Sequence, residues 1–173
     1  LDPALDIFAD VVLNPSFPEQ ELARLKKQIL ARIQQEKASP TTMAVRLLPG
    51  LLYGEGHAYA IPLTGTGTEA SVGKVTVQDL ARFHQSWFKP NNATLVIVGD
   101  IKLAEITPRL EKIFAAWKPG KAPKKNVATV AHKQKSVVYL IDKPQAQQSL
   151  VMAGHVAPLK SDPDDIAMNM MNN

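Results

Sequence analysis

The chain has 173 residues, of which 45% are hydrophobic and 21% charged. This composition is typical of a globular protein and excludes a disordered tail, a collagen-like repeat and a coiled coil. Cysteine is absent, which excludes disulfides, a thiol nucleophile and cysteine-ligated metal sites. The net charge is +4, and the positive charges gather in residues 118–135. Prolines and a glycine interrupt that stretch, so it predicts a solvated basic linker rather than a nucleic-acid site.

The first half of the chain reads as three helices followed by a loop. Apolar residues at helical spacing predict a helix over residues 3–13, with Asp2 as its N-cap, and a longer one over residues 18–38. The apolar stripe of the longer helix contains Leu22, Leu25, Ile29 and Ile33. Ser39 and Pro40 end it and begin a third helix, whose buried face we expect to hold Met43, Ala44, Leu47, Leu48 and Leu51. Residues 53–67 carry four glycines and a proline without periodicity, which predicts a loop.

The second half mixes predicted helices and strands. Thr76 and Asp79 have the spacing of a capping box, and the helix that follows should bury Leu80, Phe83 and Trp87. Residues 93–98 form an apolar run that predicts a buried strand and is far shorter than the roughly 18–20 residues of a membrane span. A helix over residues 103–117, the basic linker, strands at 136–142 and 148–156 and a final helix opened by residues 161–165 complete the order.

These elements predict two domains of unequal size. Residues 1–118 form the first, residues 119–134 the basic linker and residues 135–173 the start of the second. The second part is too small to bury a core by itself. We therefore expect the chain to be a fragment of a longer protein.

The chemistry-bearing residues show no active site by their spacing. A helical zinc pair needs two histidines four positions apart, and none of the four histidines has such a partner. Loop residue His57 and strand-end residue His155 keep a functional alternative, whereas His84 is expected to be a surface or half-buried polar residue. No Walker-type lysine follows a glycine-rich loop, and no serine lies in a Gly-x-Ser-x-Gly turn.

The order of elements resembles the pitrilysin/insulinase-type (M16) zinc metallopeptidases, which include the mitochondrial processing peptidase and its bacterial relatives. Four stretches, spread over nearly the whole chain, carry the likeness. They are residues 4–18 followed by Glu19-Gln-Glu-Leu22; Leu52-Tyr-Gly-Glu-Gly-His-Ala-Tyr59 with Leu63-Thr-Gly65; Val75-Thr-Val-Gln-Asp-Leu80 through Trp87-Phe-Lys-Pro-Asn-Asn-Ala93 to Leu95-Val-Ile-Val-Gly-Asp100; and Gln147-Gln-Ser-Leu-Val-Met152. The resemblance implies an α+β fold of the M16/LuxS-like metallohydrolase type, with helices packed on a mixed, mostly antiparallel sheet.

The resemblance also implies where a zinc ligand would lie. Active members hold zinc with an inverted His-x-x-Glu-His motif, which has no copy here, and with a glutamate on a later helix. On the helix that matches, the two acidic positions of the family are Leu25 and Arg32. A guanidinium cannot ligate Zn²⁺ and would repel it. Glu36, one helical turn beyond Arg32, is the alternative ligand if the alignment shifts.

The function implied is that of a non-catalytic half, with no catalytic or metal-binding residue of its own. Such a half would help to enclose a peptide substrate in a chamber, while a partner half carrying His-x-x-Glu-His supplies zinc. Two alternatives stay open: a catalytic zinc metalloendopeptidase half that uses Glu36, and a purely structural or assembly subunit of the same fold. Resemblance to bacterial relatives suggests the periplasm. No nucleic-acid partner and no membrane span are expected.

Overall fold

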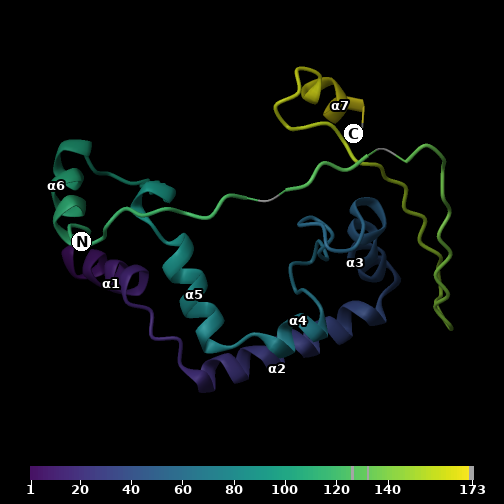
Figure 1. Ribbon diagram of the computed structural model, residues 1–173, viewed down its shortest axis with the longest axis horizontal. Coiled ribbons are helices and arrows are strands. Elements are labelled where there is room, and N and C mark those ends of the chain that lie inside the picture. The colour runs from purple at the N-terminus through teal and green to yellow at the C-terminus, as the bar shows by residue number, and fades with distance from the viewer. Residues whose placement is uncertain (126, 132, 172–173) are drawn as a thin grey trace. The chain divides into compact units, whose positions relative to one another are not determined.

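A computed structural model of the chain describes residues 1–125, 127–131 and 133–171 (Figure 1). The chain divides into two compact units. Unit 1 contains Leu1–Gln28 and Ala70–Lys125, and unit 2 contains Ile29–Glu69 and Asn126–Asn173. The described residues form α-helices and one short 3-10 helix, joined by long segments without regular structure. The predicted division at residues 118 and 135 stays a prediction.

Unit 1 is built around the packing of α1 (Asp2–Leu13) against α6 (Leu103–Ile113). Its apolar centre includes Ala9 and Ile106, which are both buried. The rings of Phe8 and Phe114 meet edge to face with 6.2 Å between their centroids. Asp2 is the first residue of α1 rather than its N-cap, because Leu1 holds the cap position without a side-chain hydrogen bond. The Asp2 carboxylate instead accepts a hydrogen bond of 2.6 Å from Arg109.

The capping box at α5 (Val77–Trp87) is confirmed. The Thr76 hydroxyl accepts a hydrogen bond from the Asp79 amide, and the Asp79 carboxylate accepts one from the Thr76 amide. The expected buried face of this helix is wrong, because α5 has no buried residue and Phe83 is exposed. The Phe83 ring lies 6.3 Å from the ring centroid of Trp87 and 6.5 Å from that of Phe88.

Helix α2 (Glu19–Ala38) has the length that the sequence predicts, and its C-terminal part belongs to unit 2. There Ile33 is fully buried, whereas Leu25 of the same expected stripe is exposed. Helix α3 (Pro40–Tyr53) begins at Pro40 as expected and is followed by the predicted loop. A short helix that the sequence did not predict, α4 (Glu69–Lys74), follows this loop, and α7 (Asp165–Met171) comes last.

The expected α+β fold with a sheet is wrong for the described residues, because they contain no strand. A strand exists only when its backbone groups pair with a neighbouring strand. The predicted strands at 93–98, 136–142 and 148–156 do not form such ladders, and Figure 1 draws them as coil. Their apolar side chains are consequently open to solvent, as Val98, Leu140 and Val151 show.

One further bound differs from the expected one. Helix α6 ends at Ile113 rather than Trp117, and the Trp117 indole donates a hydrogen bond of 3.2 Å to the Phe88 carbonyl. The short 3-10 helix η1 (Pro90–Asn92) lies between α5 and residues 93–98. None of the described helices is both long and apolar enough to cross a membrane.

Candidate functional site

The three positions that the resemblance singles out lie on α2 and differ in their surroundings. Leu25 is exposed. The Arg32 side chain is 67% exposed and contacts Glu36 with its Nε 3.3 Å from Oε1. The Glu36 side chain is only 8% exposed. Among these three positions, only Glu36 is buried.

Glu36 forms a buried ion pair with Arg46 of α3. One guanidinium nitrogen of Arg46 lies 2.5 Å from Glu36 Oε2, and the Arg46 side chain is 7% exposed. The same carboxylate oxygen accepts a hydrogen bond of 2.7 Å from the Thr66 hydroxyl. Arg46 also donates to the Thr66 hydroxyl at 2.7 Å and to the Gly67 carbonyl at 2.6 Å. A charge taken out of water needs such compensation, because desolvation otherwise costs several kcal/mol per ion.

The loop after α3 places Thr66 beside the ion pair, and two glycines with positive φ angles flank this residue. Gly65 and Gly67, on either side of Thr66, have φ angles of +74° and +70°. Glycine adopts this left-handed region without the penalty that a Cβ imposes. Thr64 completes the arrangement, with its hydroxyl 3.0 Å from that of Thr66. We call Glu36, Arg46, Thr64, Thr66 and Gly67 the Glu36 network.

The electrostatics of the network favour an ionised Glu36. Burial raises the pKa of its carboxyl, but hydrogen bonds from Thr66, Arg46 and Thr64 and the charge of Arg46 outweigh burial. The net result is a pKa below the usual value. No buried side-chain nitrogen or oxygen of the described residues lacks a hydrogen-bond partner. The network is thus a satisfied structural cluster in which the charge of the ionised Glu36 is balanced by that of Arg46.

A second, more exposed ion pair lies beside the network. Lys37 of α2 pairs with Glu69, the first residue of α4, and Gln34 donates a hydrogen bond of 3.1 Å to the same carboxylate. The hydrogen bond from Lys37 is the largest cause that lowers the pKa of Glu69. The loop end is consequently held to α2 at two successive places, Thr66 and Glu69.

The donor set around Glu36 does not fit a zinc ion. Zinc takes carboxylate, imidazole or thiolate ligands, usually four in all. No cluster of three or more such side chains occurs among the residues that the structure describes. The oxygens of Glu36 are engaged by the cationic groups of Arg32 and Arg46 and by the Thr66 hydroxyl. A divalent cation would have to displace two arginines to reach this carboxylate.

The hydrogen bonds that the structure shows for His57, His84 and His155 do not involve the Glu36 network. Half-buried His84 has its Nε2 2.7 Å from the Val12 carbonyl, so it ties α5 to the end of α1. His57 has its Nε2 2.9 Å from the Ala128 carbonyl. His155 is exposed and contacts the carbonyl of its neighbour Val156. His132 lies outside the described residues.

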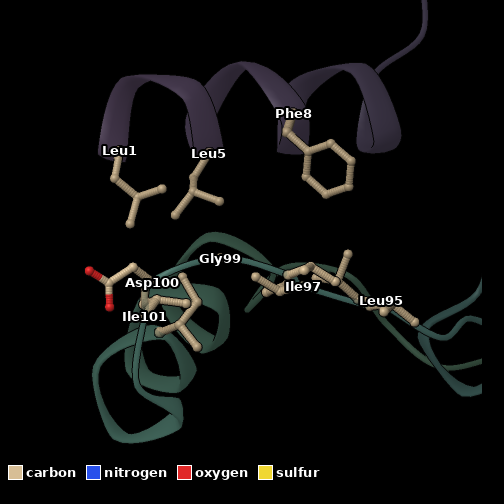
Figure 2. A pocket seen from close by; sticks show the side chains of 11 residues that line it. Leu1, Leu5, Phe8, Leu95, Ile97, Gly99, Asp100 and Ile101 are labelled. Atoms are coloured by element: carbon tan, nitrogen blue, oxygen red, sulfur yellow. The ribbon is translucent and has the colours of Figure 1, made fainter.

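Unit 1 contains an apolar groove of about 620 Å³ between α1 and residues 95–101. Figure 2 shows Leu5 and Phe8 of α1, together with Leu1 just before it, pointing toward residues 95–101. Asp100 is the one ionisable side chain in its lining. A groove with so few polar groups offers packing surface and no acid–base chemistry.

Sequence reasoning missed Arg46, Thr64 and Thr66. The available signal was an arginine within the apolar pattern of the third helix, where a buried charge requires a partner. The helix break at Ser39 and Pro40 separates Glu36 from Arg46 by ten residues, which is compatible with a helical hairpin. The threonines carried no such signal, because their contact with Glu36 spans 30 residues.

Comparison with known proteins gives a consistent result. Residues 74–173 match the family model described as the peptidase M16 inactive domain. A solved structure of a peptidase M16 inactive domain from Pseudomonas fluorescens superposes with a TM-score of 0.67 and 33% sequence identity, over 76% of this chain and 31% of that one.

Two curated relatives illustrate the range of similar proteins. The chloroplastic stromal processing peptidase of Arabidopsis thaliana is 28% identical over 64% of this chain and 8% of its own length. A Helicobacter pylori protein named non-peptidase homolog YmxG is 25% identical over 84% of this chain and 33% of its own length. The chain thus spans at most a third of either relative.

Proposed function

Because the chain belongs to the peptidase M16 family and carries the inactive domain of that family, we propose that it shapes and closes a peptide-enclosing chamber. A partner M16 half with a His-x-x-Glu-His motif would supply zinc, the activated water and the general base. The single observation that carries the proposal is the Glu36 network. It commits the carboxylate nearest to the family's ligand position to a buried ion pair.

The name of the Helicobacter pylori relative supports this proposal, since it describes a homologue without peptidase activity. The stromal processing peptidase shows that similar sequence also occurs within proteins named as peptidases. Both names are compatible with one catalytic half and one half that has lost its metal ligands. We extend the proposal to the periplasm as the compartment, which cell fractionation of the full-length protein tests.

The experiment compares peptidase activity of the partner half with and without this chain. We expect cleavage of an unfolded peptide to require both, and Arg32→Glu in this chain to leave that activity unchanged. Activity that persists when this chain is removed would contradict a required role. Activity absent from every combination, with the complex intact, would favour the purely structural or assembly subunit.

The catalytic alternative, in which Glu36 is a zinc ligand, has a separate test. Zinc in the purified full-length protein is measured for the wild type, for Glu36→Gln and for Glu21→Gln, an exposed glutamate of the same helix. We expect the same zinc content in all three, because the carboxylate of Glu36 is held by Arg46 and Thr66. Stoichiometric zinc that is lost only in Glu36→Gln would overturn the proposal.

A further inference from the structure

Residues 127–131 and 133–134 of the predicted linker belong to unit 2 and are fastened there. We call residues 127–131 and 133–139 the strap. They carry no regular secondary structure, and Figure 1 shows this part of the chain as an extended trace. Two side chains fasten the strap to α3 and the loop after it: His57 from the loop and Lys133 from the strap itself.

His57 is held in one orientation and one tautomer. Its ring stacks on Tyr53 of α3, with 5.1 Å between centroids and 13° between planes. The Tyr59 amide donates a hydrogen bond of 3.0 Å to Nδ1. Nδ1 is therefore the acceptor nitrogen, and in the neutral imidazole the proton belongs to Nε2. Nε2 then donates to the Ala128 carbonyl at 2.9 Å.

Lys133 makes the second attachment, in which a side chain of the strap reaches to α3. Its ammonium donates a hydrogen bond of 2.7 Å to the Leu51 carbonyl, in the last turn of α3. Carbonyls in the last turn of a helix lack intrahelical donors and attract cations. The same ammonium donates to the Tyr139 hydroxyl at 3.0 Å and lies 5.2 Å from the centre of the Tyr139 ring.

The beginning of the linker is fastened independently within unit 1. The Asn91 side chain donates to the Gly120 carbonyl at 2.9 Å and accepts from the Gly120 amide at 3.0 Å. Residues 121–125 make no hydrogen bond or ion pair with any described residue. Three lysines lie in this short stretch, and all three are exposed: Lys121, Lys124 and Lys125.

We propose that His57 and Lys133 hold the strap on α3, and that, among the linker residues the structure describes, residues 121–125 are the ones that move freely. Residues 121–125 are then a short mobile stretch between Gly120, which is bonded to Asn91, and the strap. Local opening has a low cost where backbone hydrogen bonds and contacts are few and a higher cost where they are made.

Limited trypsin digestion of the full-length protein, with the cleavage sites identified by mass spectrometry, tests the proposal. Lysines occur both in residues 121–125 and in the strap, so trypsin can cut in each. Lys118 and Lys143 precede proline and are therefore poor trypsin sites. We expect cleavage after Lys121, Lys124 and Lys125 to be about tenfold faster than after Lys133 and Lys135, because the strap must open first. Equal rates in the two groups would overturn the proposal.

A matched pair of variants assigns the effect to His57. His57→Phe keeps a ring to stack on Tyr53 and removes both hydrogen bonds, so cleavage after Lys133 and Lys135 should accelerate to the rate at Lys121. His155→Phe, the same change at an exposed histidine, should leave every rate unchanged. Unchanged strap cleavage in His57→Phe, or equal acceleration in both variants, contradicts the proposal.

Cleavage after Arg46, which is buried, reports general unfolding. If it also rises in His57→Phe, Tyr139→Phe decides the matter, because that variant removes only the hydroxyl bonded to Lys133. Faster cleavage after Lys133 in Tyr139→Phe then supports the strap, and an unchanged rate overturns it.

Discussion

Two arginines contact Glu36 and differ in how far they are removed from water. Arg46 is 7% exposed and donates to the carboxylate, a hydroxyl and a carbonyl, whereas Arg32 is 67% exposed. An exposed pair is screened by solvent, but a buried carboxylate that loses its partner keeps its desolvation cost. The same nominal interaction therefore has different consequences at the two positions.

Arg46→Met is expected to lower the free energy of unfolding several times more than Arg32→Met. Methionine keeps much of the side-chain volume in each case, so the comparison isolates the charge and the hydrogen bonds. Urea unfolding of the full-length protein measures the difference as a shift in midpoint. Equal shifts for the two variants would mean that the Glu36 network does not stabilise the fold.

The acid response of the chain follows from Glu36, Glu69 and Asp79, whose carboxyl pKa values are all lowered from their usual values. A carboxyl whose pKa is lower in the folded than in the unfolded state stabilises the fold at any pH above its unfolded-state pKa. This stabilisation is lost as the pH falls through the folded-state pKa. We expect the urea midpoint to be constant from pH 7 to about 5 and to fall below pH 4.5.

Thr66→Val provides the control for this pH response. It removes one donor to Glu36 and so raises the folded pKa of that carboxyl. The loss of stability on acidification should then be smaller and should be complete at a higher pH. An identical pH profile in wild type and Thr66→Val would show that the acid response arises elsewhere in the chain.

At the scale of single elements, α5 offers the cleanest test of local sequence. Its first turn depends on the reciprocal hydrogen bonds of Thr76 and Asp79, and the bond from Thr76 is the main cause of the lowered pKa of Asp79. Thr76→Ala should destabilise the protein by about 1 kcal/mol, the usual cost of a lost N-cap.

Thr76→Ser keeps the capping oxygen and should change stability by only a few tenths of a kcal/mol. The two variants are compared by urea unfolding, with helix content followed by circular dichroism. Equal destabilisation by alanine and serine would assign the effect to the lost methyl group rather than to the cap.

Local signals predicted those elements whose causes are local. The α2 bounds follow from its periodicity and from Ser39 and Pro40, and α5 follows from its capping box. Helix α4 was missed, because Val72 and Gly73 are weak helix formers within only six residues. The strands failed because pairing is a property of two segments, and an apolar run such as residues 93–98 carries no information about its partner.

The candidate site divides in the same way. The absence of an acidic residue at Leu25 and Arg32 can be read directly from the sequence. The burial of Glu36 cannot, because it depends on Arg46 and Thr66, which lie 10 and 30 residues away. Long-range contacts of this kind leave no periodic signal in the sequence.

At the scale of the molecule, large apolar side chains are exposed along much of the described chain. Val98, Leu140 and Val151 are each at least 92% exposed, and the groove beside α1 adds further apolar area. Large apolar patches mark interaction surfaces or promote aggregation.

Residues 1–173 expressed alone are therefore expected to self-associate and to bind a hydrophobic dye. Size-exclusion chromatography should show elution above the monomer mass of 18.9 kDa. Val98→Lys combined with Leu140→Lys should shift elution toward the monomer, whereas lysine substitution of the exposed polar residues Gln35 and Gln85 should not. A dye-negative monomer would contradict this expectation.

The Glu36 network also constrains how this sequence can diverge. Loss of Arg46 alone leaves a buried carboxylate without its ion-pair partner, and loss of Glu36 alone leaves a buried guanidinium without one. Neutral replacement of the whole cluster carries no such penalty, but it requires simultaneous changes in two helices and a loop. Across descendants of this chain, positions 36, 46 and 66 should accordingly vary together or not at all. An alignment in which they vary independently would show that the fold tolerates the loss of one member of the network without changes in the others.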